Sequence, residues 1–145
     1  MTDPLTEKFW EAIPPAWFST RAQIRRIATE QFNLTVKQFQ ALRRIRRGLN
    51  TVSAIAEDSQ TSRPAVSIAV EVLVHKGLVS RLTDPDDRRH IQLSLTEAGA
   101  RAMDQIYLET NQWLEAKFAC LSPLERSQLL AALDLLQGAL QGSPK

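Results

Sequence analysis

The stretch DPDDRRHIQLSLTEAG, residues 84–99, decides the fold. Two adjacent arginines stand in a short charged turn, and apolar residues then alternate with polar ones over 91–95, which is typical of a β-strand. Thr96 follows as a helix cap. Residues 78–83 can form a second strand before the turn. The stretch therefore predicts a two-stranded hairpin with cations at its tip.

Two helices are predicted directly before this hairpin. The first covers 51–58, and the second runs over 63–76 with Ser62 as its cap. Projected at about 100° per residue, the second helix has two distinct sides. The side expected in the core carries Val66, Val70, Leu73 and Gly77, and the side expected to face outward carries Pro64, Ile68, Glu71 and His75.

Helices are also predicted on both sides of this region. The first begins at Asp3, and the pair Pro14–Pro15 is expected to interrupt or re-aim it, with a second helix over about 15–31. Thr35 and Gln38 form a capping box, and the segment SPLE at 122–125 forms another. We therefore expect a mainly α fold with a small two- or three-stranded β wing.

Length and composition indicate one intracellular domain. The chain has 145 residues, of which 43% are hydrophobic, and a single cysteine. No signal peptide or membrane span is visible, so we expect a cytoplasmic protein without a membrane partner. Cys120 is predicted to be a buried, inert thiol. His75 and His90 lack the spacing of metal ligands, and we expect no metal, no cofactor, no catalytic residue and no enzyme activity.

Charge is unevenly distributed along the chain. Residues 21–101 hold 14 Lys and Arg against 8 Asp and Glu, whereas the two ends together hold 4 against 8. Arginine supplies 13 of the 18 cations. Because the guanidinium group makes forked contacts to phosphate, the basic middle of the chain favours a nucleic-acid partner.

A helix pair followed by a hairpin is the winged-helix arrangement, in which the second helix enters a major groove and the hairpin turn reaches the adjacent minor groove. Arg88 is expected to project toward DNA, while Asp87 holds Arg89 and has a structural role in the wing. The predicted DNA-binding residues are Ser62, Arg63, Pro64, Ala65, Ser67, Ile68, Arg81, Arg88 and Arg89.

Residues 51–99 resemble the DNA-binding lobe of the MarR family of bacterial transcriptional regulators. The resemblance is carried by KGLV at 76–79, Arg81, DRR at 87–89, and the pattern of Leu95, Thr96 and Gly99. It implies a homodimer held by helices at about 1–33 and 97–145, with a winged-helix lobe at about 34–96, in a single domain over 1–145. It also implies a repressor of a palindromic operator, an inverted repeat in double-stranded DNA, that releases DNA when a small aromatic acid or phenol binds.

One feature departs from the family pattern, which often carries arginines where this chain has Ile68 and Val72. Apolar groups there can contact thymine methyls but supply no charge. The alternative function is accordingly a winged-helix module that binds another protein.

The aromatic residues Trp10, Trp17, Phe18 and Trp113 are expected in the core or a subunit interface rather than in a pocket. Trp17 and Arg21 remain candidates for binding a ligand. The four arginines of the helix after Thr35 are interpreted as partners of the helix dipole. They are Arg43, Arg44, Arg46 and Arg47.

Overall fold

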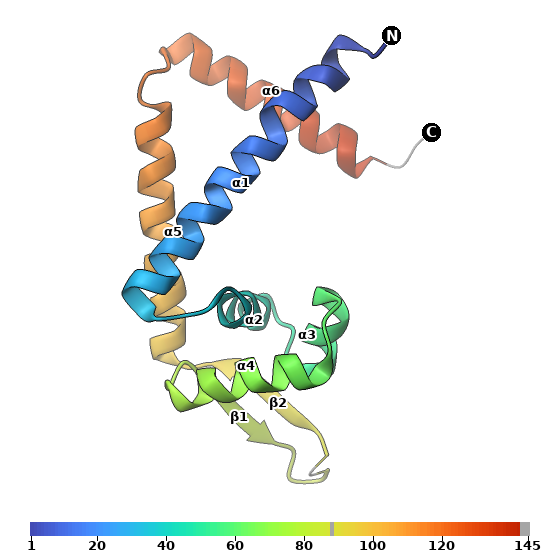
Figure 1. The fold of residues 1–145 in the computed structure, drawn as a ribbon, viewed down its shortest axis with the longest axis vertical. Coiled ribbons are helices and arrows are strands. Elements are labelled where there is room, and N and C mark those ends of the chain that lie inside the picture. The colour runs from blue at the N-terminus through green and yellow to red at the C-terminus, as the bar shows by residue number, and fades with distance from the viewer. Residues whose placement is uncertain (88, 143–145) are drawn as a thin grey trace. The chain divides into compact units, whose positions relative to one another are not determined.

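The computed structural model describes residues 1–87 and 89–142. The described residues form six helices and one hairpin: α1 (Pro4–Phe32), α2 (Val36–Arg46), α3 (Val52–Ser59), α4 (Arg63–His75), β1 (Val79–Thr83), β2 (Ile91–Leu95), α5 (Glu97–Phe118) and α6 (Pro123–Gln141) (Figure 1). They belong to two compact units, Met1–Thr110 and Asn111–Lys145. The predicted mainly α fold with a small β wing is confirmed, and the wing has two strands.

The predicted break in the first helix is wrong, because α1 runs through Pro14 and Pro15 without interruption. Each proline removes one backbone donor, but the proline ring fixes φ near the helical value, and the helix continues on both sides. Asp3 caps the helix by accepting the Thr6 N–H at 3.2 Å. At the other end, Asn33 adopts a left-handed conformation with φ 52° and closes the helix.

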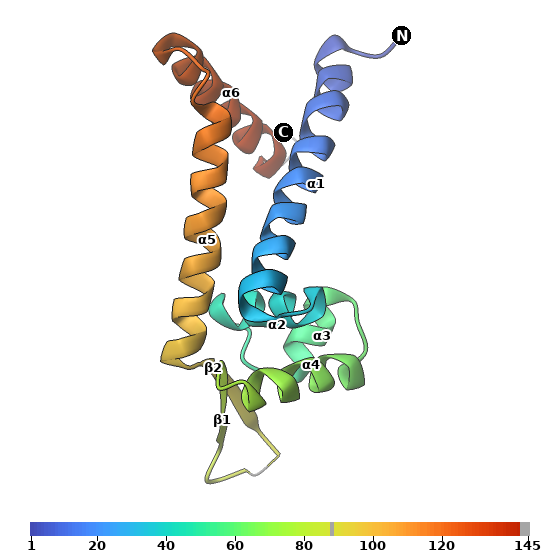
Figure 2. The same ribbon diagram turned by 60° about the vertical axis from the view of Figure 1, so that its left-hand side comes forward.

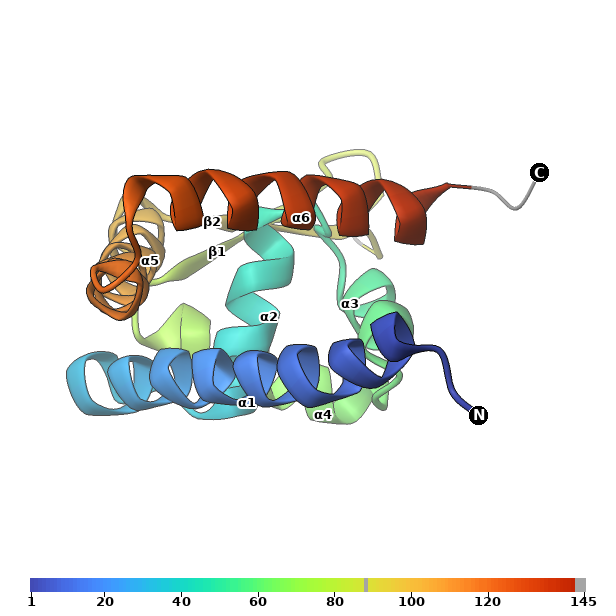
Figure 3. The same ribbon diagram turned by 90° about the horizontal axis from the view of Figure 1, so that it is seen from above.

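The core of the first unit lies between α2, α3, α4 and the hairpin. Leu42, Val70 and Leu73 are completely buried there. Figure 3 shows α2 crossing α1 at a steep angle, and α2 also packs against α3, α4 and β2. The Thr35–Gln38 capping box is present at the start of α2, as predicted. Helix α2 is therefore the element around which the unit is built.

The two predicted sides of α4 are confirmed. Val66, Val70 and Leu73 are buried, whereas Ile68 keeps 68% of its surface exposed. Ser62 caps the helix by accepting the Ala65 N–H at 3.3 Å. The sequence period thus fixes which residues α4 presents outward.

Strands β1 and β2 pair antiparallel and extend away from the helices (Figure 2). The register places Val79 opposite Leu95 and Thr83 opposite Ile91. A single further backbone bond joins β2 to the segment before α3, where the Leu93 N–H donates to the carbonyl of Asn50 at 2.7 Å. One bond does not extend the sheet to a third strand.

The base of the hairpin is closed by Thr96, which joins three segments. Its hydroxyl donates to the carbonyl oxygen of Gly77 at 2.6 Å and accepts the Gly99 N–H at 3.0 Å. A Cβ on Gly99 would lie 2.1 Å from the carbonyl oxygen of Leu78, so only glycine fits. The pattern of Leu95, Thr96 and Gly99 therefore has a structural reason at this junction.

Lys76 joins the end of α4 to the end of α1. Its ammonium group donates to the carbonyl oxygens of Phe32 and Asn33, more than 40 residues earlier in the chain. A cation at a helix C-terminus compensates carbonyl groups that have no intrahelical partner. The contact fixes the C-terminal ends of α1 and α4 to each other.

The second unit contains the end of α5 and all of α6. Ser122 and Glu125 form the predicted capping box of α6. The prediction that Cys120 is buried is wrong, since it is exposed in the turn between the helices, with its thiol 3.4 Å from the Lys117 carbonyl. No described segment packs over the turn between α5 and α6, so the Cys120 side chain is exposed. Among the described residues, no helix combines the length and apolar character needed to cross a membrane.

Candidate nucleic-acid interface

The outward side of α4 begins with small and polar groups. Ser62, Arg63, Pro64, Ser67 and Ile68 are exposed, and Ala65 is half-buried. The first N–H groups of a helix carry a partial positive charge, and short side chains let this helix end approach an anionic partner closely. The start of α4 is thus accessible enough to enter a groove of DNA.

Glu71 is the acidic residue on the outward side of α4, and it is paired. The Arg81 guanidinium of β1 donates to its carboxylate. This hydrogen bond and the positive charge of Arg81 lower the pKa of Glu71 below its usual value. The pair ties the hairpin to α4 and cancels a negative charge that would repel phosphate.

The hairpin turn is organised by two aspartates. The Asp84 carboxylate accepts the Asp86 N–H at 2.9 Å, and the Asp87 carboxylate accepts the Arg89 N–H at 3.0 Å. Asp87 also lies 3.5 Å from the Arg89 guanidinium, whose side chain nevertheless stays 93% exposed. Two side-chain-to-backbone hydrogen bonds therefore hold the described part of the turn, and the cationic side chain of Arg89 is open to solvent.

The structure brings some of the predicted DNA-binding residues together and separates others. The start of α4 presents its residues as one group, and Arg89 lies on the neighbouring hairpin. Arg81 is engaged with Glu71 rather than free. Arg88 lies outside the described residues.

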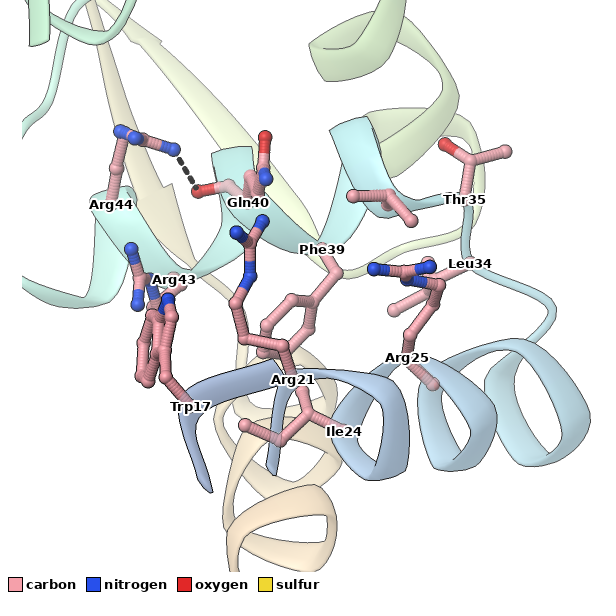
Figure 4. Close-up of a pocket in the computed structure, with 12 residues that line it drawn as sticks. Trp17, Arg21, Ile24, Arg25, Leu34, Thr35, Phe39, Gln40, Arg43 and Arg44 are labelled. Atoms are coloured by element: carbon pink, nitrogen blue, oxygen red, sulfur yellow. Dashed lines mark hydrogen bonds between the residues drawn. The ribbon is translucent and has the colours of Figure 1, made fainter. Parts of the chain in front are cut away.

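Trp17 and Arg21, the candidate ligand-binding residues, line a pocket between α1 and α2 (Figure 4). The Arg21 guanidinium lies 5.7 Å from the centre of the Trp17 ring, within the range of a cation–π contact. Trp17 is 51% exposed and Trp10 and Phe18 are also exposed, so these three aromatic residues are outside the core of this chain. Trp113 is half-buried.

The pocket also contains residues that sequence reasoning missed. Arg25 follows Arg21 by one helical turn, and Arg43 and Arg44 reach the same space from α2. The four-residue spacing of 17, 21 and 25 is a signal that was available in the sequence. Arg43 and Arg44 were interpreted as partners of the helix dipole, and only the crossing of α1 and α2 shows that they face α1.

Comparisons with known proteins agree with this geometry. Residues 34–91 match the model of the MarR family. A curated HTH-type transcriptional regulator of Mycobacterium bovis is 29% identical over 97 residues, which are 67% of this chain and 68% of that protein.

Solved structures share the fold. A transcriptional regulator of Thermotoga maritima has a TM-score of 0.82 at 21% identity, over 93% of this chain and 95% of its own. A mutant of MepR from Staphylococcus aureus, bound to an oligodeoxyribonucleotide, has a TM-score of 0.71 at 22% identity, over 92% of this chain and 98% of its own.

A helix pair with an adjoining two-stranded wing defines the class of winged-helix transcriptional regulators. Within that class, the lobe from α2 to the start of β2 matches the model of the MarR family over residues 34–91. The resemblance read from the sequence is confirmed, and the lobe is a DNA-binding winged helix.

Proposed function

We propose that the protein is a homodimeric repressor that binds an inverted repeat in double-stranded DNA and acts in the cytoplasm without catalysing a reaction. The observation that carries the proposal is the pairing of an exposed, small-residue start of α4 with a hairpin turn that exposes the Arg89 side chain on the same lobe. The first suits a major groove, and the second suits the narrow, negative minor groove.

The contacts to DNA are assigned by position. Small and polar groups at the start of α4 meet base edges and phosphates, Ile68 contacts a thymine methyl, and the hairpin turn supplies cations. Asp87 keeps the turn in shape. The proposed DNA-binding residues are Ser62, Arg63, Pro64, Ala65, Ser67, Ile68, Arg81, Arg88 and Arg89.

Two chains are needed because each unit leaves apolar surface uncovered. In the first unit, α1 exposes Leu5, Trp10 and Phe18. In the second, no residue of α6 is buried, and its leucines stand open to solvent. Burying such surface against an identical chain is strongly favourable. Two-fold symmetry of the protein then requires a palindromic site.

Release of DNA by a small aromatic ligand is proposed at the pocket that Trp17 and Arg21 line. Arg44 lines the same pocket, and its guanidinium pairs with Asp58 of α3 at 2.7 Å. A ligand that draws Arg44 away from Asp58 would loosen α2 from the helix pair that holds α4. One ion pair thus links the pocket to α3, the helix that precedes α4.

Selection of bound sequences from a random DNA pool tests the proposal. We expect enrichment of an inverted repeat, with log affinity falling linearly with log salt. Arg88→Ala is expected to weaken binding and reduce the salt slope by about 1, whereas Lys8→Ala on α1 leaves both unchanged. A pool without enrichment would reject the proposal. In that event, loss of a protein partner on Ile68→Glu would support the interaction-module alternative.

A further inference from the structure

The pocket between α1 and α2 has an unusual charge. Four arginines line it, Arg21 and Arg25 from α1 and Arg43 and Arg44 from α2, and its lining contains no carboxylate. Arg44 is balanced by Asp58 at 2.7 Å, and its side chain is only 12% exposed. For the other three arginines, no ion pair is found among residues 1–87 and 89–142.

Arg43 is the strongest sign of a missing partner. Its Nε is buried and has no hydrogen-bond acceptor among the described residues. A buried donor without an acceptor is costly, and few occur in native proteins. Figure 4 shows the Arg43 side chain reaching the pocket from α2. An anionic ligand in the pocket would supply the acceptor that Arg43 lacks.

The rest of the lining defines the shape of the ligand. Phe39 and Leu34 are buried behind the pocket, and Trp17 and Ile24 contribute apolar surface from α1. The volume is about 250 Å³, below the roughly 300–1,000 Å³ of pockets for drug-sized ligands. A single aromatic ring with short substituents fits this space.

We propose that the pocket selects a single-ring aromatic compound that carries two anionic groups, carboxylate or phosphate, over compounds with one or none. One carboxylate engages one guanidinium in a forked contact and leaves the other two cations without an anionic partner. A second anionic group pairs with those cations. The inference rests on the proposed function, since it names the ligand class for the pocket at which DNA release is proposed.

Calorimetry with three probes of similar size tests the inference: isophthalate with two carboxylates, benzoate with one, and benzyl alcohol with none. We expect isophthalate to bind at least about tenfold more tightly than benzoate at low salt, because each charge-assisted contact contributes about that factor. Added salt should narrow the difference. Equal affinities for isophthalate and benzoate would overturn the inference.

Variants locate the binding. Arg25→Gln and Arg43→Ala are expected to bring isophthalate affinity close to that of benzoate, while Arg26→Ala, on the same helix but outside the pocket lining, leaves it unchanged. Arg25 is exposed, so its substitution keeps the inference testable if Arg43→Ala fails to fold. An equal loss in Arg26→Ala would show that the net charge, and not this pocket, attracts the ligand.

DNA binding measured in the same samples separates the two hypotheses. If isophthalate binds more tightly than benzoate but the protein stays bound to its DNA, the selectivity of the pocket is supported and the proposed release of DNA by the ligand is rejected. If benzoate releases DNA at the same concentrations as isophthalate does, release of DNA by the ligand stands and the selection for two charges is overturned.

Discussion

Arg44 of α2 and Asp58 of α3 form an ion pair at 2.7 Å that joins two helices of the DNA-binding lobe. The hydrogen bond from Arg44 is the main reason that the pKa of Asp58 lies below its ordinary value of 3.8, and the charges of Arg44, Arg47 and Arg43 add to it. The pair is therefore both a helix contact and a source of acid sensitivity.

The first prediction concerns this acid sensitivity. Because the pKa of Asp58 is lowered in the folded state, its stabilising effect is present above pH 3.8 and is lost as the pH falls through the folded-state value. Asp58→Asn should lower the free energy of unfolding near neutral pH, and this effect should shrink as the pH falls below 3.8. Urea unfolding over a series of pH values measures this. Glu57→Gln, at the neighbouring position and without an ion pair among the described residues, is the control for the loss of one negative charge near neutral pH.

The second prediction separates the two sides of α4. Leu73→Ala empties a fully buried position and is expected to cost about 2–5 kcal/mol of unfolding free energy. Ile68→Ala, on the exposed side, should change stability by less than about 0.5 kcal/mol. Ile68→Ala should instead weaken discrimination for a thymine in the selected DNA site. A large loss of stability in Ile68→Ala would contradict this division of roles.

The third prediction tests the junction between the hairpin and α5. In Gly99→Ala the new methyl group would meet the Leu78 carbonyl oxygen at 2.1 Å, so β1 and α5 must separate. We expect a loss of about 1–3 kcal/mol in unfolding free energy. Gly138→Ala is the control, since nothing lies within 4 Å of its new methyl group. That control should be neutral or slightly stabilising.

The fourth prediction separates helix capping from DNA contact at Ser62. Ser62→Asp keeps a side-chain oxygen that accepts the Ala65 N–H, so thermal stability should be maintained. Its carboxylate would repel phosphate, and affinity for DNA should fall. Ser62→Ala removes the cap without adding a charge, so it should lower the free energy of unfolding by about 0.5–2 kcal/mol and reduce DNA affinity less than Ser62→Asp does. Unchanged DNA affinity in Ser62→Asp would remove this residue from the interface.

Local patterns predicted most of the lobe. Capping residues such as Thr35 and Ser62 start the helices where side-chain oxygens precede an apolar period, and the two sides of α4 follow from helical spacing alone. The continuous α1 was not predicted, because the effect of Pro14 and Pro15 depends on whether the neighbouring turns hold the helix together. The predicted burial of Cys120 is wrong because the exposure of a turn residue depends on which distant segments pack over it, and the local sequence does not contain that information.

The pocket was only partly predicted for a related reason. Trp17 and Arg21 lie on one helix at a spacing that the sequence displays, whereas Arg43 enters the pocket from another helix. Which arginines share a space depends on the angle at which α1 and α2 cross. That angle arises from the packed core and is not encoded in either segment alone.

The contact of Lys76 with the last carbonyl groups of α1 has a mechanical consequence. Because this contact ties the two helix ends together, a rotation of α1 in the proposed dimer would also displace the C-terminal end of α4. In the proposed dimer, the number of base pairs between the operator half-sites is then set by the orientation of α1. A change in that orientation would put the reading helices out of phase with successive turns of the double helix.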